Sequence, residues 1–250
     1  LATCSARVRL AVAKAVKLAE IARADHPVRT AVLALGGDLV EGGGNIFPGQ
    51  IHEIQSGVFT QLFHVAGLVE EAVLTLLDAF ESVVVYEVAG NHARIGKRGD
   101  YAREDNVDAI VGKIARDRLS NQPRLTWHEP GNWFQVIECG AYRALLCHGD
   151  QIKSFGGNVP AYGILRKANA WAAGAVREPF RDVLMGHFHT PMQLTLANGG
   201  TVWVNGSPES DNIYAQEFVA AMGKPSQRLL FVDPKRGRVT SDFCLWLDEG

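Results

Sequence analysis

Apolar residues recur along this chain with two spacings, one typical of helices and one typical of strands. Helical spacing of three or four positions is clearest at residues 55–80, where Phe59, Leu62, Phe63 and Ala66 begin a long apolar face. The same spacing predicts helices at residues 6–24, about 106–119 and 161–174.

Short apolar runs bounded by glycine, proline or polar residues predict the strands. The Gly/Pro-rich residues 42–49 predict a loop, and turn signals between two pairs of runs predict hairpins around Gly140 and residues 234–237. The predicted strands are residues 30–36, 82–89, 125–128, 133–138, 142–147, 183–185, 201–204, 229–232 and 238–247.

The order of these elements predicts an α/β fold. Strands and helices alternate early in the chain, whereas the later elements are mostly strands. We find no internal repeat or linker, so we expect a single domain over residues 1–250, with a mixed β layer and flanking helices.

Composition excludes several classes of function. The 250 residues carry a net charge of −2, and the pI of about 6.5 leaves no global basic footprint for nucleic acid or anionic lipid. No apolar run reaches the length of a membrane span, and we recognise no signal peptide. The four cysteines are scattered, which favours reduced thiols and a cytoplasmic location.

Polar residues with metal-binding side chains follow four of the predicted strands. The carboxyl ends of strands in α/β sheets are where ligands gather. One carboxylate, one amide and three imidazoles meeting there indicate a metal site. The motifs are Gly37-Asp38, Gly90-Asn91-His92, His148-Gly149-Asp150 and Gly186-His187-Phe188-His189.

These four motifs resemble, in the same order, successive signatures of the calcineurin-like metallophosphoesterase family. The resemblance spans residues 37–189, and the layout of the chain is similar to that of phage-encoded members. It implies a four-layer α/β/β/α sandwich of two mixed sheets flanked by helices. It also implies a metal-dependent phosphoesterase, most plainly a phosphodiesterase, with two divalent metal ions.

The resemblance implies a role for each ligand. Asp38 would bridge the two metals, Asn91, His148 and His187 would complete the shell of the second metal, and His189 would belong to the first. Imidazole and amide ligands suit manganese, iron, zinc or nickel better than magnesium or calcium; the resemblance favours manganese. Asn91 has an alternative interpretation as a turn residue.

His92 would not bind metal in this scheme but would protonate the leaving oxygen of the substrate, as an imidazole can near neutral pH. Glu41, three residues after Asp38, would orient the ring of His92. An ordinary surface acid is the alternative interpretation of Glu41.

A basic loop follows His92. Arg94, Lys97 and Arg98 could grip phosphates that flank the scissile one, which favours a phosphodiester substrate and leaves open a single-stranded or small nucleic acid. The acidic residues mixed into residues 100–105 leave a solvated charge run as the alternative.

One family signature is missing. The Asp-x-His motif that normally ends the first strand does not occur, and Asp25-His26 is no substitute, because it precedes its strand. The chain begins at Leu1 without a methionine, so we expect the missing motif and its strand to lie upstream.

Two other functions remain open from the sequence. One is a DNA exonuclease similar to the double-strand-break repair nucleases. The other is a protein-binding scaffold whose metal site has decayed, which the missing signature suggests and the presence of His92 opposes. The oligomeric state is not predicted.

Overall fold

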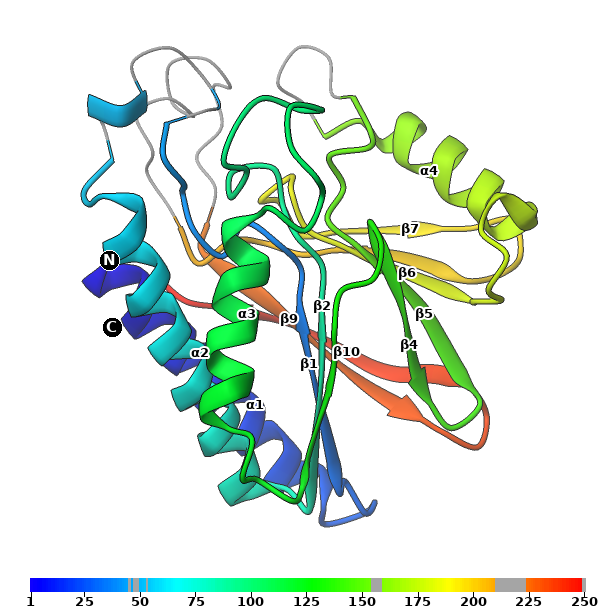
Figure 1. Ribbon diagram of the computed structural model, residues 1–250. Coiled ribbons are helices and arrows are strands. Elements are labelled where there is room, and N and C mark those ends of the chain that lie inside the picture. Colours follow the sequence, from blue (N-terminus) through cyan, green and yellow to red (C-terminus); the bar gives the residue numbers. More distant parts are fainter. Residues whose placement is uncertain (45, 47–49, 53, 154–158, 210–223, 249–250) are drawn as a thin grey trace. The chain divides into compact units, whose positions relative to one another are not determined.

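The computed structural model describes residues 1–44, 46, 50–52, 54–153, 159–209 and 224–248 (Figure 1). Contacts within the chain divide it into two compact units, Leu1–Trp133 and Phe134–Gly250. Residues 45 and 47–49 of the loop predicted at residues 42–49 lie outside the described residues. The single domain expected from the sequence stays a prediction.

The elements of the first unit follow the predicted pattern, apart from one short 3-10 helix that was not predicted. Its three strands are parallel in the order β1-β2-β3, with Leu35 opposite Glu87 and Tyr86 opposite His128. The three carboxyl ends therefore lie at the same edge of the sheet. The elements are α1 (Ala2–Ala22), β1 (Thr30–Leu35), the 3-10 helix Gln50–His52, α2 (Val58–Ala79), β2 (Ser82–Glu87), α3 (Val107–Arg118) and β3 (Leu125–His128).

Three helices lie together along this parallel sheet in Figure 1. Helix α2 packs against α1, α3 and β2, and its Val73 is fully buried, as are Val83 and Val85 of β2. Most of the apolar face predicted for residues 55–80 is thus buried, but Phe59 and Phe63 near its start are exposed, so the prediction was wrong for these two residues. A bidentate contact of Arg9 with Glu71, 2.7 Å at its shorter arm, joins α1 to α2 at the surface.

Glu87, the last residue of β2, is buried in the first unit although it can carry a charge. A Cβ atom at Gly112 of α3 would lie 1.8 Å from Glu87 Oε2, so only glycine lets the helix pack on this carboxyl group. Burial raises the pKa of Glu87 to about 7, while the indole of Trp127 and the charge of Arg116 oppose the rise.

The second unit contains one element that was not predicted, the short strand β7. Helix α4 ends at Ala170 instead of near residue 174; a π-helical turn follows, and Gly174 takes a φ of 114°. The elements are β4 (Phe134–Cys139), β5 (Tyr142–Cys147), α4 (Ala161–Ala170), the π turn Trp171–Ala175, β6 (Asp182–Met185), β7 (Met192–Thr195), β8 (Thr201–Val204), β9 (Ser226–Asp233) and β10 (Arg238–Trp246).

Five strands of this unit form a mixed sheet in the order β4-β5-β6-β8-β7. Strands β5, β6 and β8 are parallel, with Cys147 opposite Met185 and Met185 opposite Val204. Their carboxyl ends again share one edge. Strands β9 and β10 form the second predicted hairpin, which Asn205 anchors by accepting a hydrogen bond of 2.8 Å from the backbone N–H of Arg228.

The predicted α/β class with several sheets and flanking helices is confirmed. The sheet of the first unit is parallel throughout its described strands, because each connection passes through a helix. The four-layer order of the sheets stays a prediction. Among the described residues, no helix is long and apolar enough to cross a membrane.

The buried Glu87 predicts a pH-dependent stability. Between its ordinary pKa of 4.5 and its folded pKa of about 7, the folded protein holds a proton that the unfolded chain loses, so the free energy of unfolding falls as the pH rises. Glu87→Gln removes this loss. We subtract the free energy of unfolding of wild type from that of Glu87→Gln at each pH. We expect this difference to be greater at pH 8 than at pH 5 by about 2 kcal/mol.

Urea unfolding at the two pH values measures this difference. The exposed Glu81→Gln on the same unit is the control for loss of a negative charge. An equal effect of Glu87→Gln at both pH values would contradict the raised pKa.

Candidate metal centre

Asp38 lies in the loop after β1, where the chain turns sharply. Gly37 and Asp38 both take positive φ angles, 85° and 54°. The backbone N–H of His92 donates to Asp38 Oδ1 at 2.8 Å, which brings the loops after β1 and β2 together. A Cβ atom at Gly90 would lie 2.1 Å from the same oxygen, so this close approach requires glycine at position 90.

A buried carboxylate that the sequence analysis missed holds these two loops in place. Asp108 accepts hydrogen bonds from the backbone N–H groups of Asp38, Leu39 and Gly90 at 2.8 to 2.9 Å. The backbone N–H of Asp108 donates to Oδ1 of Asn106, which is the N-cap of α3. The side-chain nitrogen of Asn106 donates in turn to the Gly90 carbonyl. Asn106 and Asp108 look in sequence like any helix start, so nothing in the sequence marked this role.

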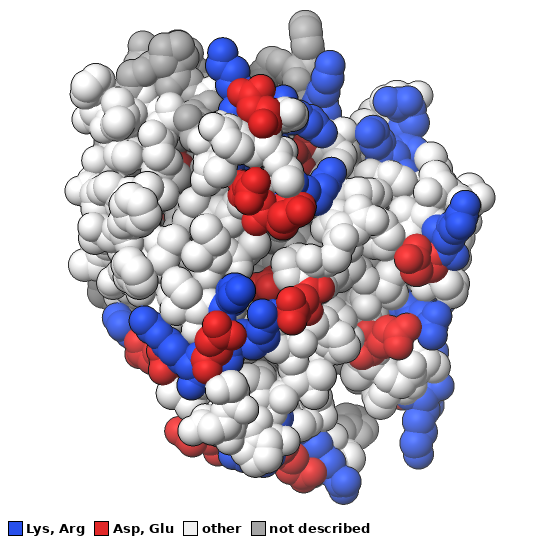
Figure 2. Space-filling model, in the orientation of Figure 1, with Lys and Arg blue, Asp and Glu red and all other residues white. Residues whose placement is uncertain are grey.

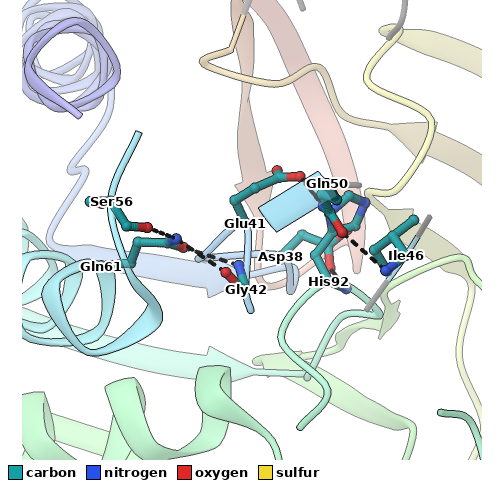
Figure 3. Close-up of polar contacts among 8 residues, drawn as sticks. All are labelled: Asp38, Glu41, Gly42, Ile46, Gln50, Ser56, Gln61 and His92. Atoms are coloured by element: carbon teal, nitrogen blue, oxygen red, sulfur yellow. Dashed lines mark hydrogen bonds and ion pairs between the residues drawn. The ribbon is translucent and has the colours of Figure 1, made fainter. Parts of the chain in front are cut away.

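His92 and Glu41 come close together in the same unit. Glu41 Oε1 lies 3.3 Å from His92 Nδ1, and both side chains are partly exposed (Figure 3). This distance places a carboxylate oxygen beside the His92 ring, and the roles predicted for the two residues stay predictions. Asn91, between Gly90 and His92, is partly exposed, and its predicted role as a ligand also stays a prediction.

The basic loop after His92 lies at the surface. Lys97 and Arg98 are exposed, whereas Arg94 is partly buried and forms an isolated β-bridge with Asn106. Figure 2 shows basic and acidic side chains interspersed on the face in view, with no continuous basic patch there. Contact of Arg94, Lys97 and Arg98 with substrate stays a prediction.

Two predicted ligands of the second unit lie side by side. His148 follows β5 and is 1% exposed, and His187 follows β6. The N–H of Gly186 donates to the His148 carbonyl at 2.9 Å, and His148 Nε2 lies 3.2 Å from His187 Nδ1. The parallel pairing of β5 with β6 therefore places two ring nitrogens at one point.

The spacing of the two nitrogens fits a shared metal ion. Two nitrogen ligands with metal bonds of about 2.1 Å lie about 3.0 Å apart at a right angle and about 3.4 Å apart at the tetrahedral angle. The observed 3.2 Å falls between these values. The rings are nearly perpendicular, with an interplanar angle of 72°, so they do not stack. Imidazole donors suit transition metals such as manganese or zinc.

The backbone is strained at three of the predicted ligands. Among the described residues, the non-glycine residues with positive φ are Asp38, His187 and His189, at 54°, 68° and 55°. Such conformations cost free energy and are concentrated at functional sites in proteins.

His189 is separate from the histidine pair. It is exposed, and its ring nitrogens are not grouped with those of His148 and His187 as possible ligands of one ion. This fits its assignment to a different metal, which stays a prediction. Asp150, next to His148 and Gly149, accepts a hydrogen bond of 2.6 Å from Gln151 within its own turn.

Comparisons with known proteins give no family assignment. No family model matches the chain, and no curated protein matches it either. Vps29 of Entamoeba histolytica, solved as a complex with Zn²⁺, is 15% identical over 88% of this chain and 99% of its own, with a TM-score of 0.38.

Two further solved structures are similarly distant. A hypothetical protein of Pyrococcus horikoshii OT3 is 14% identical over 96% of this chain and 85% of its own, with a TM-score of 0.40. A predicted phosphoesterase of Streptococcus pneumoniae TIGR4 is 11% identical over 86% of this chain and 96% of its own, with a TM-score of 0.35. With identities and TM-scores this low, the likenesses assign no activity, metal or partner to this chain.

The buried Asp108 predicts a large effect of a small substitution. Asp108→Asn replaces one acceptor oxygen with an NH₂ group that faces backbone N–H donors, and it removes the negative charge. We expect the free energy of unfolding to fall by about 2 kcal/mol or more. Urea unfolding measures it, with the exposed Asp117→Asn on the same helix as the matched control. Equal effects of the two substitutions would show that the Asp108 hydrogen bonds contribute nothing specific.

Proposed function

We propose that this protein is a metal-dependent phosphoesterase that hydrolyses phosphodiesters. The observation that carries the proposal is the pair of ring nitrogens of His148 and His187, 3.2 Å apart at the carboxyl ends of two parallel strands. Asp38 and Asn91 follow strands of the first unit in the same way. The proposal requires the two units to bring these side chains to one ion.

In this proposal Asp38, His148 and His187 each supply one ligand atom, and Asn91 supplies an amide oxygen. The donor set suits a transition ion, with manganese favoured and iron, zinc and nickel as alternatives. His189 would serve a second ion. When bound, the metals polarise the phosphoryl oxygens and lower the pKa of a bound water.

The residues beside the metal have separate tasks. His92 protonates the leaving oxygen, since a departing alkoxide needs a proton. Glu41, 3.3 Å from His92 Nδ1, holds the ring by accepting its N–H. Asp38 accepts the backbone N–H of His92 through Oδ1, which links the proposed acid to a proposed metal ligand.

The exposed Lys97 and Arg98 favour a substrate that has phosphates on both sides of the scissile bond. We therefore include nucleic acid, single-stranded or small, among the proposed substrates; a repair-type exonuclease is the second candidate. Manganese-dependent turnover of bis-p-nitrophenyl phosphate, compared with labelled single- and double-stranded DNA, separates the two. Faster cleavage of double-stranded DNA ends than of the small diester would favour the exonuclease.

The metal ligands and the acid should respond differently to mutation. We expect His148→Ala and His187→Ala to lose bound metal. We expect His92→Ala to keep the metal but lose turnover by about 10²- to 10⁴-fold. Elemental analysis and steady-state kinetics measure the two effects, and the exposed His26→Ala is the matched control.

Two outcomes would reject the proposal. Unchanged metal content in His148→Ala and His187→Ala would rule out the histidine pair as ligands. Less than one metal ion per wild-type chain, without turnover, would favour a protein-binding scaffold. Removing the metal with a chelator should abolish turnover, and adding manganese back should restore it.

A further inference from the structure

Two buried glutamines that the sequence analysis did not single out hold the segment after Asp38 (Figure 3). Gln50 is 1% exposed and begins the 3-10 helix Gln50–His52, whereas Gln61 is 4% exposed and lies in α2. Burying a carboxamide costs free energy unless it is hydrogen-bonded, so the partners of each glutamine show what it holds.

Gln61 holds backbone. Its Oε1 accepts the N–H of Gly42 at 3.0 Å, and its Nε2 donates to the carbonyls of Gly42 and Ser56 at 3.2 and 2.7 Å. This glutamine fixes the course of the chain one residue after Glu41, and its described hydrogen bonds all join backbone groups.

Gln50 instead holds the Glu41 side chain. The backbone N–H of Ile46 donates to Gln50 Oε1 at 3.0 Å. Because a backbone N–H can only donate, this contact fixes the orientation of the amide. Gln50 Nε2 therefore faces Glu41 Oε1 and donates to it.

The same oxygen of Glu41 lies 3.3 Å from His92 Nδ1. Glu41 Oε1 thus accepts from Gln50, and it can accept from His92 only if Nδ1 carries the proton. With Nδ1–H held in this way, the protonated ring donates its other proton, from Nε2, and the neutral Nδ1–H form is what remains. The fixed amide of Gln50 sets the direction of its own two hydrogen bonds, from Ile46 and to Glu41.

From this geometry we infer that Gln50 is a positioning residue for the Glu41–His92 pair, an inference that rests on the proposed phosphodiesterase function. Glu41 is partly exposed. Its side chain could therefore rotate away from His92, and water could hydrogen-bond to its carboxylate instead. The buried Gln50 amide holds one carboxylate oxygen toward His92 and so selects the Nδ1–H form of its ring.

The experiment compares Gln50→Met with Gln61→Met, since methionine keeps most of the glutamine volume without its hydrogen bonds. The substrates are methyl p-nitrophenyl phosphate, which has an acidic leaving group, and methyl phenyl phosphate, which has a far less acidic one. Only the second ester depends strongly on a proton from His92.

For Gln50→Met we expect kcat to fall by about 10- to 100-fold with the phenyl ester. With the p-nitrophenyl ester we expect a clearly smaller loss, and metal content and KM should stay unchanged. Gln61→Met should lower kcat for both esters by the same factor. The double variant Glu41→Gln, Gln50→Met should be no slower than Glu41→Gln alone, because Gln50 acts through Glu41.

Equal losses of Gln50→Met with both esters, or additive losses in the double variant, would overturn the inference. ¹⁵N NMR of the His92 ring in the zinc-loaded protein tests it without turnover. We expect the Nδ1–H form in wild type and Gln61→Met and a mixture of the two neutral forms in Gln50→Met. If wild type hydrolyses neither ester, the proposed function fails, and the NMR result alone decides the role of Gln50; an unchanged ring in Gln50→Met would reject it.

Discussion

The candidate site of the first unit depends on one buried carboxylate. Asp108 accepts the backbone N–H groups of Asp38, Leu39 and Gly90, groups that sheet pairing leaves without partners where the strands end. Hydrogen bonds to an ionised acceptor are about twice as strong as neutral ones, and burial strengthens them further. Helix α3 thereby holds two loops that β1 and β2 alone would leave free to move.

The left-handed backbone at Asp38 and at His187 is held by neighbouring contacts. At Asp38 the restraint comes from Asp108 and from the His92 N–H. At His187 it comes from the bond between Gly186 and the His148 carbonyl. The two units thus share one arrangement. In each, a strained residue follows a strand, and the loop after the adjacent strand holds it in place. Such preorganisation means that, in the proposed function, these ligands would need little rearrangement to bind an ion.

Much of the fold could be predicted from the sequence because helices and strands bury residues at different periods. The long α2 and the hairpin around Gly140 are examples. Strand β7 was not predicted because Met192–Thr195 has only four residues, too few to show a periodic pattern of apolar positions. The end of α4 was misplaced, because the alanines of residues 170–175 suit a helix and only the positive φ of Gly174 breaks it.

For the site, the sequence predicted side chains of distinctive chemistry but not the side chains that support them. His148 and His187 are recognisable because each follows a strand within a glycine motif. Asp108, Gln50 and Gln61 are ordinary polar residues, and only tertiary contacts reveal their partners. Their importance comes from burial, which no local pattern of polar residues encodes.

The contact between Gly112 and Glu87 has a consequence for how this chain can evolve. Any side chain at position 112 would press on the Glu87 carboxyl group and push α3 off the sheet, carrying Asp108 with it. In divergent relatives, an alanine or serine at position 112 should therefore occur together with a shorter residue at position 87. The two positions are expected to covary although neither belongs to the candidate metal centre.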